Sequence, residues 1–346
     1  MKNHTIKIVF LFVLLIALAA CQVTPVTETK TDVPGPSETA AAVIIEESNA
    51  DELVVVLSEA ISTGAVNLTW TANGDAFWAE DLYTALLHDG ETAAEISRFV
   101  PGINSAIYDT SPDGKTIAYA VETDDIRLYD METESDAVVI TTGFPYSGAF
   151  FSPDGNTLAV PSLMDIKVMF YDTASGEETG SVSGFSTAAP VYNAKFSPDG
   201  KTMLWFSRGT VQPMDISTQT LGPVLSHEDF VTYQAVSPDG KVIATTAAGM
   251  VDDAYQPLLT LWNAANGSVM AQIAMPTYYT AISFSPDSKL IAAGTEEGII
   301  IFTSPFGEEV GRYPTSEPIT DIEFSPDGTR LASVSDMGLL QVYKVK

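Results

Sequence analysis

The side chains that most often carry catalysis are scarce in this sequence. It contains three histidines, His4, His88 and His227, and a single cysteine, Cys21. No H-E-x-x-H motif, G-x-S-x-G elbow or P-loop occurs in it, and such motifs place a metal ligand, a nucleophile or a phosphate-binding turn. Because His88 and His227 belong to separate parts of the chain, we expect exposed loop residues and not a catalytic pair. The sequence predicts no catalytic residue, no metal site and no cofactor.

Carboxylates are abundant by contrast. The chain has 45 Asp and Glu against 16 Lys and Arg, a formal net charge of −29. Few cations are available to replace the counterions of phosphates, which argues against nucleic-acid binding and against an electrostatic hold on anionic lipid. Carboxylates could act as an acid/base pair about 5 to 10 Å apart on a glycan, converge as about six oxygens on Ca²⁺, or steer a basic partner. The elements that position them decide between these roles.

A repeated turn organises those elements. FSPDG occurs at 151–155, 196–200 and 324–328, with variants TSPDG at 110–114, VSPDG at 236–240 and FSPDS at 284–288. Proline presets φ for the first corner of a turn, aspartate takes the second, and glycine supplies the positive φ that reverses the chain. Each copy therefore predicts a β-hairpin. The motif serines, at positions 111, 152, 197, 237, 285 and 325, are separated by 41, 45, 40, 48 and 40 residues.

Two more strand-like segments follow each predicted hairpin. The third segment often ends in an aromatic residue and Asp or Asn, as at Tyr129-Asp130, Tyr171-Asp172 and Trp262-Asn263. Forty residues before Ser111 stands Thr71, followed by the reversal pair Asn73-Gly74, which marks one further unit without the proline. The chain therefore contains seven units of about four strands.

Seven such units, with a period of about 40 to 45 residues, resemble WD40 repeats, which form β-propellers. The resemblance implies an all-β, seven-bladed β-propeller. The Gly-His pair found in many eukaryotic WD40 repeats is missing, so we expect apolar packing between blades in place of their hydrogen-bond network. The seventh unit ends after its third strand, and the segment ELVVVL at 52–57 has no hairpin partner. We predict that this segment becomes the outer strand of the last blade and closes the ring.

The N-terminus resembles a bacterial lipoprotein signal. Lys2 and Lys7 accompany an apolar run, IVFLFVLLIALAA, that is too short to span a bilayer comfortably. The letters LAACQ resemble the lipobox, whose cysteine, here Cys21, is lipidated and becomes the first residue of the mature chain. We predict a signal peptide at 1–20, a lipidated flexible linker at 21–51 and the propeller at 52–346. The chain thus resembles a bacterial WD40-repeat lipoprotein, which implies an extracytoplasmic protein held at a membrane only by the lipid on Cys21, at the cell surface or in the periplasm.

The resemblance also indicates a partner-binding face. In WD40-like rings, the loops between blades and those joining second to third strands emerge together, and partners usually bind there. Here we expect that face to be acidic and aromatic, with the candidate binding residues Asp124, Asp125, Phe144, Tyr146, Asp165, Phe230, Asp252, Asp253, Tyr278, Tyr279, Glu296, Glu297 and Asp336. Aromatic anchors and steering carboxylates favour a non-catalytic platform for a protein or peptide partner, basic or glycan-bearing, on a monomeric scaffold. Hydrolysis by loop carboxylates, a structural Ca²⁺ and a role in envelope assembly stay open as alternatives.

Overall fold

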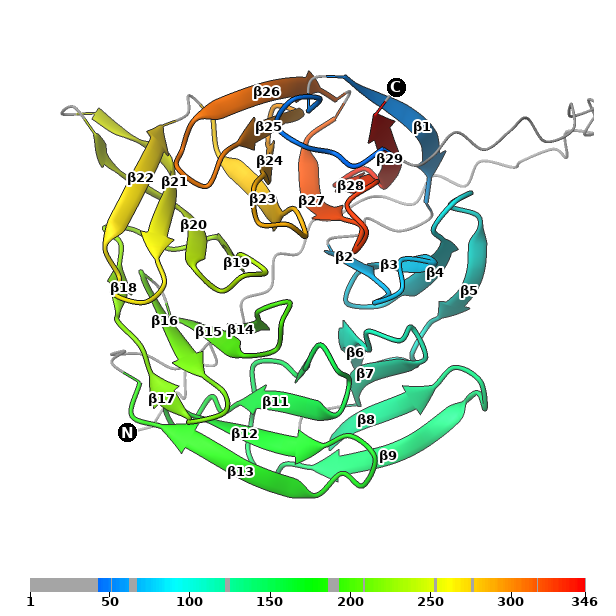
Figure 1. Cartoon of the computed structure of the whole chain (residues 1–346). Helices are drawn as coiled ribbons and strands as arrows, with labels where there is room; N and C mark the ends of the chain where they lie inside the picture. The colour runs from blue at the N-terminus through cyan, green and yellow to red at the C-terminus, as the bar shows by residue number, and fades with distance from the viewer. Residues whose placement is uncertain are drawn as a thin grey trace, which may run out of the picture. The chain divides into compact units, whose positions relative to one another are not determined.

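The computed structural model describes residues 43–50, 52–61, 67–121, 125–185, 193–207, 209–251, 254–274, 277–315 and 317–345. These residues form seven antiparallel β-sheets, the blades, arranged as a closed ring (Figure 1). The predicted all-β, seven-bladed propeller is thereby confirmed. Within the described ranges, no helix is long and apolar enough to cross a membrane. The predicted signal peptide and Cys21 lie outside the described residues.

Each blade runs from an inner strand near the ring axis to an outer strand at the rim. Blades 1 to 3 consist of β2 (Asn67–Trp70), β3 (Ala76–Glu80), β4 (Ala85–Asp89) and β5 (Glu95–Phe99); β6 (Ser105–Thr110), β7 (Thr116–Val121), β8 (Asp125–Asp130) and β9 (Ser135–Thr141); and β10 (Phe150–Phe151), β11 (Thr157–Pro161), β12 (Lys167–Asp172) and β13 (Glu178–Ser183). Blades 4 and 5 consist of β14 (Asn193–Phe196), β15 (Thr202–Ser207), β16 (Thr210–Asp215), β17 (Thr220–Leu221) and β18 (Leu225–Ser226); and β19 (Tyr233–Val236), β20 (Val242–Val251), β21 (Ala254–Asn263) and β22 (Val269–Ala274). Blades 6 and 7 consist of β23 (Tyr279–Phe284), β24 (Ile291–Thr295), β25 (Ile299–Thr303) and β26 (Glu309–Pro314); and β27 (Ile319–Phe324), β28 (Leu331–Ser335), β29 (Leu339–Val345) and β1 (Leu53–Ala60).

The middle strands of the blades are buried on both faces. All five residues of β3, β24 and β28 are buried, because neighbouring blades cover both sides of each sheet. Such strands need not alternate apolar with polar residues. The outer strands β5, β22 and β26 have one covered side and expose much of their length. The apolar clusters accordingly lie between blades, as where Trp70 and Phe77 of blade 1 pack with Val334 and Leu340 of blade 7.

The SPDG turns have the predicted geometry. In blade 2, Ser111 Oγ donates to Asp113 Oδ1 at 2.6 Å and accepts a hydrogen bond from Thr116 N at 2.8 Å. Both bonds recur at Ser152, Ser197, Ser237, Ser285 and Ser325. Gly114 has a φ of 75°, and Ser288 adopts a φ of 63° where the motif has lost its glycine. This local network lets each turn form from residues adjacent in sequence.

Blade 1 contains the degenerate copy of the motif. Thr71 Oγ1 donates to Asn73 Oδ1 at 2.8 Å and accepts from Ala76 N at 3.1 Å, as the serine does elsewhere. Gly74 has a φ of 72°. The additional unit that was inferred from a 40-residue step back from Ser111 is therefore confirmed as blade 1.

The ring closes between the two ends of the described chain. β1 pairs antiparallel with β29, with Leu53 opposite Val345 and Ala60 opposite Leu339, as predicted. Residues 43–50 add to this closure and cross blade 7 in front of its strands in Figure 1. Ile45 N donates to Gly328 O at 2.9 Å, and the Ile45 side chain is buried with the apolar residues of blades 6 and 7. Part of the predicted linker therefore belongs to the folded unit, which begins before residue 52.

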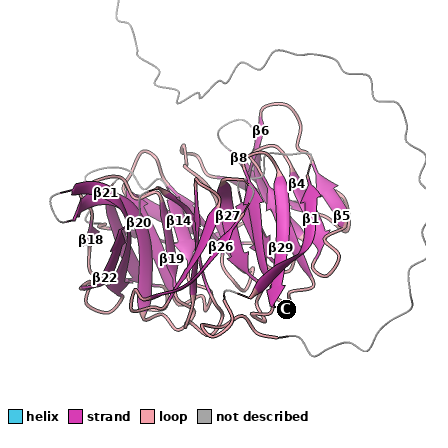
Figure 2. Ribbon diagram, turned by 90° about the horizontal axis from the view of Figure 1, so that it is seen from above, coloured by secondary structure: helices cyan, strands magenta, loops and turns pink. Residues whose placement is uncertain are grey.

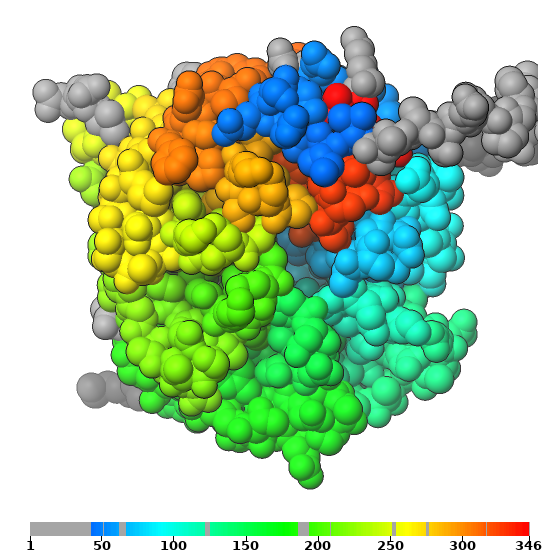
Figure 3. Space-filling model, in the orientation of Figure 1, coloured from blue at the N-terminus to red at the C-terminus, as the bar shows by residue number. Residues whose placement is uncertain are grey.

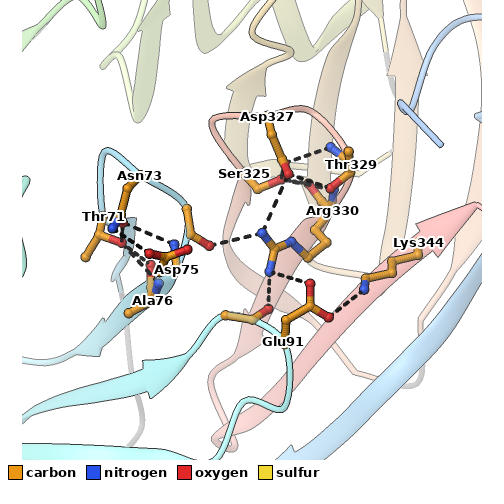
Figure 4. Close-up of polar contacts among 12 residues, drawn as sticks. Thr71, Asn73, Asp75, Ala76, Glu91, Ser325, Asp327, Thr329, Arg330 and Lys344 are labelled. Atoms are coloured by element: carbon orange, nitrogen blue, oxygen red, sulfur yellow. Dashed lines mark hydrogen bonds and ion pairs between the residues drawn. The ribbon is translucent and has the colours of Figure 1, made fainter. Parts of the chain in front are cut away.

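A buried arginine also joins blade 7 to blade 1 (Figure 4). Arg330, 6% exposed, donates from Nη2 to Gly74 O at 3.0 Å and from Nη1 to Gly90 O. Its guanidinium carbon lies 5.0 Å from the centre of the Trp70 ring, in cation–π geometry. Glu91 supplies a carboxylate oxygen 3.6 Å from Nη1. This contact, which we call the Arg330 latch, was not predicted from the sequence.

Candidate functional site

The loops of the ring emerge on two opposite faces, seen edge-on in Figure 2. The loops between blades and those joining second to third strands form one face, which we call the upper face. The SPDG turns and the turns joining third to fourth strands form the lower face. On the upper face the two kinds of loop touch, since Glu296 N donates to Tyr278 O at 3.2 Å and Leu163 N donates to Pro145 O at 2.9 Å.

The predicted binding residues divide into three groups. Exposed side chains on the upper face are Asp165, Phe230, Tyr278, Glu296, Glu297 and Asp336, and half-buried ones are Asp125 and Phe144. Outside the described residues lie Asp124, Asp252 and Asp253. Tyr146 and Tyr279 are buried.

The two buried tyrosines correct the prediction. Tyr279 begins β23, is 2% exposed and packs between blades 5 and 6, where burial raises the pKa of its phenol. Tyr146 is 7% exposed, donates to Asp125 O at 3.1 Å and packs edge-on against Tyr108. Neither ring can serve as an exposed anchor. At the end of a strand, the alternation of inward and outward residues does not show which of two adjacent tyrosines, such as Tyr278 and Tyr279, is buried.

The described carboxylates of the upper face are dispersed. Asp125 accepts a hydrogen bond from Thr141 Oγ1 at 2.7 Å, and Glu296 accepts one from Thr277 Oγ1 at 3.0 Å. Asp165 lies 3.6 Å from Lys167 Nζ. Over the part of the chain that the structure describes, no three Asp, Glu, His or Cys side chains are grouped so as to hold a metal ion. The described carboxylates of the upper face are therefore held one by one, by partners of their own.

Blades 5 and 6 carry a group of exposed apolar side chains, which we call the upper-face cluster. It comprises Phe230, Met250, Tyr255 and Tyr278, which are 60%, 50%, 56% and 50% exposed. Met250 pairs with Tyr255 across the hairpin of β20 and β21, whose ten-residue strands extend beyond their neighbours. Two of these four residues, Met250 and Tyr255, were missed from the sequence, although the 48-residue step between Ser237 and Ser285 marks the longer unit.

Hydrogen bonds hold the upper-face cluster together. The inter-blade loop that carries Phe230 supplies Glu228, whose Oε2 accepts from Met250 N at 3.1 Å, and Asp229, which accepts from the Tyr255 hydroxyl. The pKa of Tyr255 is raised to about 12, chiefly by that bond to Asp229 and to a lesser extent by the nearby Tyr278. The cluster is thus an apolar surface held by hydrogen bonds to the carboxylates beside it.

The ring has a hollow at its centre (Figure 3). A second unpredicted group, of carboxylates, lies on the inner strands β6 and β27. Asp321 Oδ2 accepts from Leu68 N at 2.7 Å, and Asp109 Oδ2 accepts from Phe151 N at 2.7 Å. Each carboxylate belongs to the blade preceding that backbone group. The innermost strand of a blade has an unpaired edge, so these contacts satisfy N–H groups that lack a strand partner.

Burial raises the pKa values of carboxyl groups near the centre of the ring. Desolvation raises the pKa of Asp109 to about 7 and that of Glu323 to about 8, while Lys195 acts against both shifts. Desolvation, with repulsion from Asp109, Asp321 and Glu323, raises the pKa of Glu80 well above its usual range. Glu80 Oε2 is buried and has no hydrogen-bond partner among the described residues. Burial thus favours the neutral form of all three carboxyls, Glu80, Asp109 and Glu323.

The histidines are not the exposed loop residues that we expected. His88 lies within β4, is 2% exposed, stacks on Phe77 and donates from Nδ1 to Ala93 O at 2.7 Å. His227 packs edge-on against Trp262, and desolvation lowers its pKa to about 4. His88 thus packs inside blade 1, and the half-buried His227, in the loop after β18, packs at the junction of blades 4 and 5. Neither environment could be inferred from a lone histidine in the sequence.

Comparison with known proteins places this geometry among propellers. Residues 209–346 match the family described as "Lipoprotein LpqB beta-propeller domain". The serine-threonine kinase receptor-associated protein of Gallus gallus is 24% identical over 264 residues, which cover 75% of this chain and 72% of that protein. The WD repeat-containing protein SL1-17 of Schistosoma mansoni is 28% identical over 143 residues, 41% of this chain and 44% of that protein.

Solved structures share the fold at lower identity. The β-propeller domain of Cps50 (Swd1) from Myceliophteria thermophila has a TM-score of 0.67 and 14% identity, covering 85% of this chain and all of that one. The folded unit is a WD40-like seven-bladed β-propeller. Kuenenia stuttgartiensis hydrazine synthase also resembles this WD40-like propeller, with a TM-score of 0.67, 17% identity and coverage of 83% and 98%. Because proteins of such different names share the fold, the function of this propeller must be argued from its sites.

Proposed function

We propose that this WD40-like propeller is a non-catalytic platform that binds a basic segment of a protein partner on its upper face. The upper-face cluster carries the proposal. Four large apolar side chains, each at least half exposed, lie together over blades 5 and 6. Contiguous exposed apolar patches of this kind commonly mark interaction sites, and aromatic side chains supply much of the energy at their centres.

The charge around the cluster defines the partner. Glu228, Asp229 and Glu296 stand beside the four apolar residues, on a chain with a formal net charge of −29. Carboxylates at the rim of an interface attract cations and speed encounter, while aromatic faces favour lysine and arginine through cation–π contact. A segment that combines basic with apolar side chains therefore fits this surface best.

We further propose that the protein is lipidated at Cys21 and works outside the cytoplasm. Two observations support this: the lipobox-like letters LAACQ, and the match of residues 209–346 to a family described as a lipoprotein propeller domain. Mass spectrometry of the protein from the membrane fraction of the host cell should find a lipid on Cys21 as the first residue of the chain. An unmodified Cys21 in protein from that fraction would exclude the lipid as the anchor.

Site-specific crosslinking tests the binding surface. A photoreactive phenylalanine analogue at position 230 should capture a partner in intact cells. The same analogue at position 306, where Phe306 is 78% exposed on the lower face, serves as the matched control and should not capture it. The double variant Phe230→Ala/Tyr278→Ala should weaken that partner's binding by roughly 30-fold or more, as expected for two aromatic anchors. Equal capture from both positions, or unchanged affinity of the double variant, would refute the platform.

A further inference from the structure

A groove of about 510 Å³ opens on the lower face between blades 3 and 4. Phe170 of β12 and Phe196 at the end of β14 line it, with Ile216 from the turn that follows β16. All three belong to the apolar cluster shared by the two blades. The SPDG turns of both blades bring Asp154 and Asp199 to its edge. Its volume lies in the range typical of small-molecule sites.

The groove exists because one junction between blades is incompletely filled. In blades 3, 5 and 6 the turn after the third strand carries a glycine, Gly176, Gly267 or Gly307, that is pressed against the preceding blade. A Cβ on Gly176 would lie 2.7 Å from Val138, and one on Gly307 would lie 2.6 Å from Ala271. Val138 and Ala271 lie on the fourth strands of their blades, each paired with a residue of the third strand. In blade 3, which precedes the groove, the equivalent residue is Gly180. A Cβ there would meet nothing nearer than Gln219 Nε2 at 3.9 Å.

The edge of the groove is anionic. Hydrogen bonds from Ser152 and Asn156 lower the pKa of Asp154, so this carboxyl is ionised at neutral pH. In blades 4, 5 and 6 a lysine two residues after the motif aspartate pairs with it, as Lys201 does with Asp199 at 3.2 Å. In blade 3 that position is Asn156. The groove thus combines an aromatic floor with a carboxylate that has no lysine of its own turn beside it.

We propose that this groove binds a small organic cation with an aromatic body. The body would cover Phe170, Phe196 and Ile216, and the ammonium group would lie beside Asp154. Burial of the ring supplies apolar contact, and the cation gains from the carboxylate and from the phenylalanine faces. The site lies on the face opposite the upper-face cluster and is independent of the proposed partner.

Titration of the purified propeller with tryptamine, and with its uncharged analogue tryptophol, tests the proposal by calorimetry and by NMR. Tryptamine should bind saturably with one equivalent, and tryptophol should bind about tenfold or more weakly, the equivalent of one good charge interaction. Absence of saturable tryptamine binding, or equal affinity for tryptophol, would overturn the proposal.

Two variants locate the site. Gly180→Val should fill the groove without backbone strain, keep the melting temperature and abolish tryptamine binding. Its control is Gly102→Val, at an open position where a Cβ has nothing within 4 Å. This control should bind tryptamine as the parent protein does. Asp154→Asn keeps an acceptor for Ser152 and should weaken binding about tenfold, whereas Asp239→Asn in blade 5 should have no effect. Undiminished binding by Asp154→Asn overturns the assignment even if Gly180→Val fails to fold.

Discussion

Replacing Arg330 by methionine should weaken the junction between blades 7 and 1 more than any surface substitution of an arginine. Methionine keeps most of the aliphatic stem but removes the guanidinium that bonds to Gly74 O and Gly90 O. Those two carbonyls, at the turns of blade 1, then lose their buried donor. The contact with the Trp70 ring, 5.0 Å from the guanidinium carbon, is lost as well.

The magnitude follows from these contacts. Hydrogen bonds from a charged group contribute about 1.5 to 3 kcal/mol each, and a cation–π contact that is shielded from water adds up to about 2 kcal/mol. The guanidinium itself, 6% exposed, costs desolvation energy that its removal returns. We therefore expect the free energy of unfolding to fall by about 3 kcal/mol, within the range seen when buried polar networks are broken.

Urea unfolding, followed by both tryptophan fluorescence and far-UV circular dichroism, measures the change. Coincidence of the two curves tests whether the ring unfolds in one step. Arg98→Met is the matched control, because Arg98 is bonded to Glu95 on the exposed outer strand β5 and should change stability by less than about 0.5 kcal/mol. A loss below about 1 kcal/mol for Arg330→Met, or equal losses for the two variants, would refute the Arg330 latch.

Two further predictions concern closure and pH. Deletion of residues 52–57 removes most of β1 and exposes the edge of β29, so the truncated ring should unfold or lose several kcal/mol; unchanged thermal stability would contradict closure by this strand. The pKa values of Asp109 and Glu323, raised to about 7 and about 8, mean that the folded chain holds protons that the unfolded chain releases near pH 4. The free-energy cost of ionising these two carboxyls in the folded protein is absent below pH 4, grows as the pH rises and is complete above pH 8. Because both side chains are half-buried and so partly screened by water, we expect a loss of roughly 2 to 4 kcal/mol between pH 5 and 9, measured by unfolding at each pH. Glu323→Gln should flatten this slope, and an equally steep slope in the variant would show that other groups cause it.

Local chemistry explains which features could be predicted. Ser111, Asp113 and Thr116 complete the turn of their blade within six residues, so the motif specifies the hairpin wherever it occurs. The strand pairing that closes the ring could also be predicted. Counting the expected strands left one segment, now β1, without a partner, and left the seventh blade without an outer strand. The long hairpin of β20 and β21 is indicated by the larger spacing between two of the motif serines. No sequence pattern, however, predicts that the side chains of Met250 and Tyr255 are exposed.

Long-range neighbours explain what could not be predicted. Arg330 binds carbonyls 256 and 240 residues away, and no local pattern distinguishes it from an arginine on the surface. The same holds for Tyr279 beside Tyr278, because the residues that bury Tyr279 come from blades 5 and 6. The groove at Gly180 arises only because the turn of the next blade, at Gln219, stops short of it.

The number of blades, the turns within them and the strand that closes the ring follow from the amino-acid sequence, because each depends on spacing and on bonds between near neighbours. Which side chains reach solvent, and which carboxyls have raised pKa values, could be seen only once the blades were packed together. Those properties depend on the blade packed alongside, since water access and local charge are set by atoms that are distant in the chain.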